Sequence, residues 1–120
     1  MTKEQKELLM RDLCARLPYG VKISVDDRVE TLEGIDMLDN VVSYDCFLSS
    51  DVEEVKPYLF PMSSMTEEQR KEWQSLMIKD SYGILYYTVE SYDYLYKNHI
   101  DIRGFISMGL AIDATGLKIY

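Results

Sequence analysis

The chain has 120 residues, 47% of them hydrophobic and 28% charged, and a net charge of −8 from 13 basic and 21 acidic residues. This composition excludes a disordered chain and favours one globular domain over residues 1–120, while the negative charge opposes binding to nucleic acid or to anionic lipid. No apolar run approaches the roughly 20 residues of a membrane span, and the charged N-terminus does not resemble a secretory signal, so we expect a soluble cytoplasmic protein.

The first element predicted is a helix over residues 3–16. Thr2 and Gln5 have the spacing of a capping box, in which each side chain bonds the other residue's backbone amide. Apolar residues then recur at steps of three and four and form one stripe, made of Leu9, Met10, Leu13, Cys14 and Leu17. Pro18 and Gly20 end the helix.

Strands are predicted next. Residues 21–25 alternate between apolar and polar, residues 28–32 return after a turn at 26–27, and Gly34 marks a bulge. Residues 41–48 are rich in β-branched and aromatic side chains and predict a third strand. Short strands with short connections predict an antiparallel meander.

The segment after these strands is expected to be mostly irregular. Ser50 and Glu53 have the spacing that caps one helical turn, and Pro57 stops that turn. The apolar residues of the segment are expected to hold it against the sheet; they are Val52, Val55, Tyr58 and Leu59. Pro61 is expected to keep the following stretch irregular.

Helices return in the second half of the chain. Thr66 and Gln69 form a second capping box, which predicts a helix over residues 67–80 with Trp73 in the core. Residues 84–89 are ambiguous between strand and helix, and their side chains favour a strand. Ser91 is expected to cap a short helix that ends near residue 98. Residues 105–108 are expected to form a last turn, closed by Gly109.

Together these elements predict an α+β fold. A small antiparallel meander of three to four strands packs with the N-terminal helix and the central helix on one side, and short helices fill the C-terminal third. Cys14 and Cys46 are expected to be two reduced, buried thiols. We expect no disulfide, cofactor or metal to be needed for folding.

Two stretches of the chain carry a resemblance. The first runs from Lys56 to Glu68 and reads KPYL-F-PMSSMTEE, and the second runs from Asn98 to Ala111 and begins NHIDIRGFI. Both are similar to motifs in a family of short uncharacterised proteins from gut anaerobes of the Bacteroides group, often in prophage-like regions. The resemblance implies an origin in a mobile element. Phe60 departs from the pattern, because relatives usually have Arg there, so any role of that Arg does not carry over.

One cluster could support chemistry. A histidine side chain ordinarily titrates near neutrality, and Asp101 could orient His99 as a general base beside Arg103. The alternative is a turn in which the Asp101 carboxylate caps the following helical turn and Arg103 pairs with a carboxylate. We favour the turn, because the sequence shows no nucleophile and no second orienting group nearby.

Metal and phosphate sites find little support. The chain has one His and no Cys pair at ligand spacing, and the acidic group around Asp36 and Asp39 lacks the pattern of a calcium loop. Gly104, Gly109 and Gly116 are spaced too loosely for a phosphate-binding loop and are expected to serve as caps and turns.

Tyrosine is over-represented between residues 82 and 96, where six of the ten tyrosines lie. Tyrosine suits half-wet interfaces because its ring is apolar and its hydroxyl polar. The candidate partner-binding residues are Tyr86, Tyr87, Tyr92, Tyr94 and Tyr96. The alternative is that alternate rings pack in the core while the rest lie at its rim.

Three functions remain open. The first is a small non-enzymatic protein-interaction or accessory module of mobile-element origin, with a protein partner of unknown identity. The second is an acidic inhibitor that imitates DNA, which requires negative charges spaced like phosphates. The third is a small enzyme using His99 with Asp101, which requires a concave pocket around His99.

Overall fold

The computed structural model describes all 120 residues and confirms an α+β fold. The helices are α1 (Lys3–Arg16), α2 (Glu67–Ser75) and α3 (Val89–Lys97). The strands are β1 (Lys22–Val25), β2 (Arg28–Asp36), β3 (Val41–Tyr44), β4 (Leu48–Asp51), β5 (Val55–Pro61), β6 (Ile78–Lys79), β7 (Leu85–Tyr86), β8 (Ile100–Asp101) and β9 (Ile112–Asp113).

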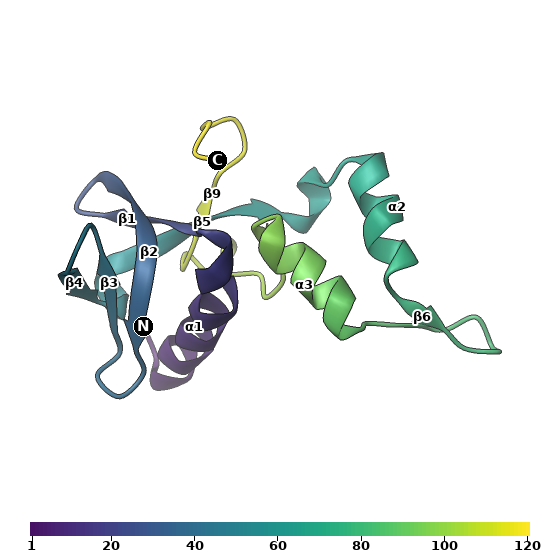
Figure 1. Ribbon diagram of the computed structural model, residues 1–120, viewed down its shortest axis with the longest axis horizontal. Helices are drawn as coiled ribbons and strands as arrows, with labels where there is room; N and C mark the ends of the chain where they lie inside the picture. The colour runs from purple at the N-terminus through teal and green to yellow at the C-terminus, as the bar shows by residue number, and fades with distance from the viewer.

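The N-terminal helix forms as predicted. The Thr2 hydroxyl accepts a hydrogen bond from the Gln5 amide at 3.1 Å, and the Gln5 side chain accepts one from the Thr2 amide at 2.9 Å, which completes the capping box. Leu9, Met10 and Leu13 are fully buried in the main core. The helix therefore packs its apolar stripe on the sheet, and Figure 1 shows α1 beside the strands.

The main sheet has the order β4-β3-β2-β1-β5-β8, with β9 also paired to β5. The pairs from β4 to β5 are antiparallel, and β8 and β9 run parallel to β5. The register shifts between Leu32 and Gly34, so the bulge predicted at Gly34 is confirmed. A Cβ at this glycine would lie 2.5 Å from the Ser43 Oγ, so a larger residue there requires the Ser43 side chain to move.

The prediction of one strand over residues 41–48 is wrong. The segment forms β3, a tight turn and β4, and the turn residues Asp45, Cys46 and Phe47 all have positive φ, at 44°, 52° and 85°. Tyr44 pairs with Leu48 across this turn. The chain thus reverses where no Gly marks a turn, and the meander gains a further strand.

The prediction of an irregular segment after residue 50 is also wrong. A short 3₁₀ turn over residues 52–54 is present, but Asp51 rather than Ser50 caps it, through a 2.9 Å bond from the Glu53 amide. Residues 55–61 then form β5 inside the sheet instead of lying against it. Proline has no backbone N–H to donate to a neighbouring strand. Pro57 is tolerated in β5 because β8 and β9 pair only with β5 residues from Tyr58 onward, so neither strand requires a hydrogen bond from Pro57.

The helical second half differs at its boundaries. The capping box of Thr66 is confirmed, but α2 ends at Ser75 rather than at residue 80, because Ile78 and Lys79 pair with β7 in a separate hairpin. The strand favoured within residues 84–89 is only two residues long. The next helix begins at Val89, and its cap is Thr88, whereas Ser91, predicted as the cap, is the third residue of the helix.

Two hydrophobic cores result. The main core has 15 buried residues between α1 and the sheet, and a second cluster has four: Met65, Trp73, Leu95 and Ile100. Trp73 is thus in a core, as predicted. The central helix α2 contacts α3 and lies beyond the sheet, contrary to the expected packing, as Figure 1 shows.

The molecule is elongated, with extents of 49 × 31 × 25 Å. Its radius of gyration is 15.2 Å, against about 13.6 Å for a compact chain of this length. The excess comes from the part formed by α2, the β6–β7 hairpin and α3, which projects from the sheet (Figure 1).

Candidate functional site

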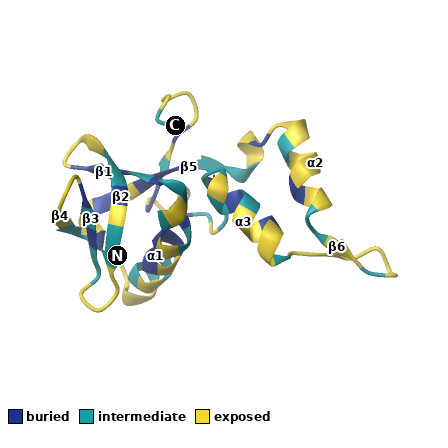
Figure 2. Ribbon diagram, viewed as in Figure 1, coloured by how far each residue is buried: buried dark blue, intermediate teal, exposed yellow.

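The projecting hairpin carries an exposed apolar surface, which we call the aromatic arm. Its side chains are Ile78, Tyr82, Ile84, Leu85, Tyr86 and Tyr87. Tyr82 is 88% exposed, and Tyr86 and Tyr87 are 52% and 54% exposed. Figure 2 shows the hairpin as exposed at the far end of the molecule. Large apolar side chains gathered in this way on one protrusion are typical of interaction surfaces.

The arm has a defined conformation despite its exposure. Ile78 pairs with Tyr86 and Lys79 with Leu85. The Asp80 carboxylate closes the turn by accepting from the amides of Tyr82 and Ile84, both at 2.9 Å. These bonds, that of Ile84 first, lower the pKa of Asp80. The turn is therefore held by a charged acceptor.

Aromatic contacts connect the arm to the second core. The Tyr87 ring lies 5.6 Å from the Trp73 ring and 5.4 Å from the Tyr92 ring, the latter edge-on. Such pairs add roughly 0.5–1.5 kcal/mol beyond the burial of their area. The arm is thus anchored at its base while its outer face stays exposed.

The six tyrosines of the stretch do not alternate between core and rim. Tyr82, Tyr86, Tyr87 and Tyr92 are exposed, and Tyr94 and Tyr96 are half-buried, so none is a core residue. The Tyr94 hydroxyl donates to the Glu72 carboxylate on α2 at 3.1 Å, which joins α3 to α2. The candidate binding residues therefore divide into exposed rings on the arm and rings on α3.

His99 is placed differently from a general base. Its ring stacks on Tyr120 with centroids 3.7 Å apart, its side chain makes no hydrogen bond, and it lines none of the cavities of the molecule. Burial, with the nearby charges of Arg16 and Lys22, lowers the pKa of His99 from 6.5 to about 4. The imidazole is therefore neutral near pH 7 and has no polar group to act with.

Tyr120 closes the other side of this stack. Its hydroxyl donates to the Tyr58 carbonyl at 2.7 Å and accepts from the Lys22 amide at 2.9 Å. Burial raises the pKa of Tyr120 to about 12. These bonds attach the end of the chain to β5 and β1, so the stack on His99 holds the C-terminal segment in place.

Asp101 and Arg103 adopt the turn geometry expected of them as structural residues. The Asp101 carboxylate accepts from the amides of Phe105 and Ile106, both at 2.9 Å, and so caps the turn that follows. The Arg103 Nε donates to the Asp12 carboxylate at 3.3 Å. Neither side chain bonds His99, so the structure does not bring the three residues together as a catalytic group.

A buried ion network lies beside them, and its burial is not visible in the sequence. Asp12 and Arg16 are both fully buried, although their i,i+4 spacing on a charged helix suggests a surface pair. The Arg16 guanidinium donates to Asp12 through Nε at 2.7 Å and through Nη2 at 3.3 Å, and Nη2 also donates to the Ile100 carbonyl at 2.6 Å. Arg103 adds a second cation to the same carboxylate.

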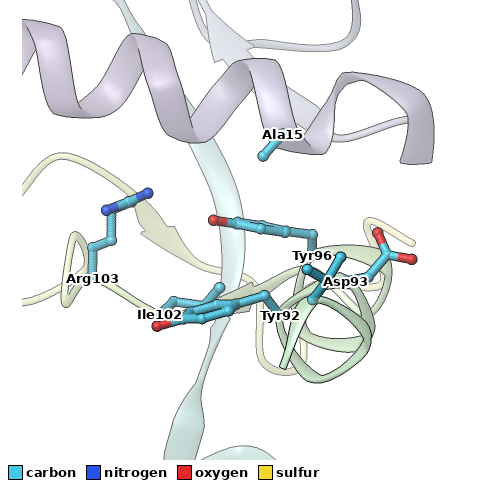
Figure 3. A pocket seen from close by; sticks show the side chains of 7 residues that line it. Ala15, Tyr92, Asp93, Tyr96, Ile102 and Arg103 are labelled. Atoms are coloured by element: carbon cyan, nitrogen blue, oxygen red, sulfur yellow. The ribbon is translucent and has the colours of Figure 1, made fainter. Parts of the chain in front are cut away.

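Arg103 also lines a groove with two of the candidate tyrosines. The groove runs between α1, α3 and residues 102–103, and Figure 3 shows Tyr92 and Tyr96 on one side of it. Residues singled out separately in the sequence, for chemistry and for binding, thus lie at one place in the fold. Nothing in the spacing of Arg103 from Tyr92 predicts this, because the contact depends on how α3 packs against α1.

Several other expectations have plain outcomes. Both cysteines are free, as predicted, but both are exposed rather than buried, because Cys14 lies at the edge of the α1 stripe and Cys46 in the β3–β4 turn.

No group of three or more potential ligands is arranged to hold a metal ion. None of the helices combines the length and the apolar character needed to cross a membrane.

Comparison with protein-family models, with curated proteins and with solved structures finds no match for this chain. The resemblance of its two motifs to a family of Bacteroides-group proteins therefore stays a prediction.

Proposed function

We propose that the chain is a small non-enzymatic interaction module that binds a partner protein through the aromatic arm. One observation carries the proposal: a two-stranded hairpin with two paired residues in each strand projects from the fold and exposes six large apolar side chains. Isolated hairpins of this size are marginal in water, so covering this one would stabilise it.

The arm's chemistry defines the partner it suits. Between residues 78 and 87 the only charged side chains are Lys79 and Asp80, and the Asp80 carboxylate is engaged by its own turn. Tyr86 and Tyr87 offer large contact areas with few rotatable bonds, so little conformational entropy is lost on binding. The Tyr86 hydroxyl donates to the Asp80 carboxylate at 3.1 Å, whereas the Tyr87 hydroxyl makes no hydrogen bond. We therefore expect a partner whose contact surface is apolar and carries a hydrogen-bond acceptor for the Tyr87 hydroxyl. Cytoplasmic location and mobile-element origin belong to the same proposal.

Paired variants test the arm. Tyr86→Ser with Tyr87→Ser removes the two central rings, and Phe47→Ser removes an equally bulky ring, 96% exposed, from the β3–β4 turn at the other end of the molecule. Affinity purification from the native host identifies proteins enriched with the parent chain. Titration of the purified candidate by calorimetry then gives its affinity for each variant.

We expect the partner to bind the parent and Phe47→Ser chains equally and to lose at least about tenfold in affinity for the arm variant, since central aromatic residues each contribute more than about 1.4 kcal/mol at interaction hot spots. Sedimentation of the purified chain shows whether the partner is a second copy. Equal affinity for the arm and Phe47 variants, or a chain that is recovered alone under several growth conditions, would contradict the proposal.

A further inference from the structure

The groove between α1 and α3 is separate from the arm and has a volume of about 630 Å³, within the range of small-molecule sites. Most of its wall is apolar. Its residues are Ala15, Val89, Tyr92, Asp93, Tyr96, Ile102 and Arg103. Figure 3 shows α1 above the groove and the two tyrosine rings of α3 with Ile102 below it.

The charges beside the groove do not balance. One carboxylate, that of Asp12, faces two guanidinium groups, those of Arg16 and Arg103. Arg16 is fully buried, and its guanidinium lies 5.1 Å from the centre of the Tyr96 ring. Arg103 uses only its Nε on Asp12, and its side chain is 32% exposed. At the Arg103 end of the groove there is therefore one more positive charge than negative, since the other carboxylate of the groove, that of Asp93, points the opposite way. The end of the Arg103 guanidinium is available to a ligand.

Further donors lie at the same end of the groove. The hydroxyls of Tyr92 and Tyr96 make no hydrogen bond to the protein, whereas those of Tyr19 and Tyr94 bond the carboxylates of Asp93 and Glu72. Figure 3 shows the Tyr92 and Tyr96 hydroxyls directed toward the Arg103 end and the Asp93 carboxylate directed the opposite way. The groove thus has a donor-rich cationic end and an acidic rim.

We propose that this groove binds a small, flat organic monocarboxylate, with its carboxylate on Arg103 and the hydroxyls of Tyr92 and Tyr96, and its apolar body against the tyrosine rings and Ile102. The two free Nη atoms of Arg103 form the fork that matches a carboxylate. A single negative charge balances the single excess positive charge, and a dianion would meet repulsion from Asp93. The flat body follows from aromatic walls that favour ring contacts.

This ligand site goes beyond the proposed interaction function and does not depend on it. The groove and the aromatic arm share no residue, but Tyr87 of the arm lies 5.4 Å from Tyr92 of the groove. Arg103 belongs to the groove and not to the arm, so Arg103 variants leave the arm intact and separate the two proposals. Failure of one proposal can therefore be told apart from failure of the other.

The test compares three probes of one shape on the full chain: 2-naphthoate, the neutral 2-naphthamide and the dianionic 2-naphthyl phosphate. Affinities and contact sites come from ¹⁵N–¹H NMR titration. The variants are Arg103→Gln, Arg103→Lys, and Tyr92→Phe with Tyr96→Phe. Arg70→Gln, an exposed arginine on α2, is the control that changes the net charge equally.

We expect 2-naphthoate to bind at least about tenfold more tightly than the amide, and more tightly than the phosphate. Arg103→Gln should remove the preference over the amide, Arg103→Lys should retain part of it, and the Phe variant should weaken the naphthoate several-fold. Arg70→Gln should match the parent chain. Three results with the parent chain alone would overturn the proposal. They are equal affinity for the naphthoate and the amide, NMR chemical-shift changes outside the groove, and no binding at millimolar probe concentration.

Discussion

The buried carboxylate of Asp12 makes the sharpest stability prediction. It accepts from Arg16 at 2.7 Å and 3.3 Å and from Arg103 at 3.3 Å, and it is fully buried. Asp12→Asn keeps the size of the side chain but leaves the enclosed guanidinium of Arg16 without a counter-charge, beside a second cation. Removing one partner of a buried ion pair costs about 3–5 kcal/mol.

The loss can be converted into a melting temperature. For a chain of this length the entropy of unfolding is about 0.25 kcal/mol per kelvin, so a loss of about 3–5 kcal/mol lowers Tm by about 12–20 °C. Small domains are stable by about 5–15 kcal/mol in total, so the variant should still fold at low temperature. Urea unfolding followed by circular dichroism gives the free energy of unfolding directly.

Two further variants define what would refute this reasoning. Glu7→Gln removes an exposed carboxylate from the same helix and should change stability by no more than about 0.5 kcal/mol. Replacing the pair together, by Asp12→Leu with Arg16→Met, should recover most of what Asp12→Leu alone loses, because no unpaired charge is left buried. An Asp12→Asn chain that loses less than about 1 kcal/mol would show that water reaches Arg16 and that the network is not enclosed.

Two other predictions concern the sheet and the C-terminal segment. Burial and the charges of Arg16 and Lys22 lower the pKa of His99 from 6.5 to about 4, so His99 should titrate near pH 4 in an NMR experiment. Because the unfolded chain binds this proton more readily, the contribution of His99 to stability is present above pH 6.5 and is lost as the pH falls toward 4. Titration near pH 6.5 would contradict the stacked geometry. Gly34→Ala should destabilise the chain by about 1–3 kcal/mol through contact with the Ser43 Oγ, and adding Ser43→Ala should restore most of it; an unchanged Tm for the single variant would mean that the bulge yields.

Local signals in the sequence were sufficient for much of the fold. Both Thr–Gln capping boxes form as the spacing predicts, because each is complete within four residues. The bulge at Gly34 and the cap by Asp101 are equally local. The α+β class follows from these elements, since β1 to β5 follow one another with no α-helix between them.

The wrong secondary-structure predictions fall where contacts between residues far apart in the chain determine the local structure. Three non-glycine residues adopt positive φ between β3 and β4, and no local rule anticipates a turn at Asp45. The sequence predicts that Pro57 stops a helical turn and that Pro61 keeps the following stretch irregular. Strand β5 nevertheless contains both prolines, because its neighbours do not need the missing amides. The predicted helix over 67–80 was cut short because residues 78 and 79 find strand partners in β7.

The candidate site, too, is predictable from the sequence only in part. Tyrosine density marks residues 82–96 as a candidate binding stretch, but which of its rings are exposed depends on how the hairpin leaves the fold. The partner of Arg103 is a carboxylate, as its charge suggests, but 91 positions separate it from Asp12 along the chain. The burial of Asp12 and Arg16 follows from the packing of α3 and β8 over the end of α1, which no helix-surface pattern reveals.

The unequal size of the two cores has a consequence for how the molecule opens. Fifteen buried residues hold α1 to the sheet, but only four hold α2 and the base of the hairpin. Local opening costs free energy in proportion to the apolar contacts it breaks, so the smaller unit separates at a lower cost than global unfolding. We therefore expect amide exchange to show the protruding part opening at a lower free energy than the sheet.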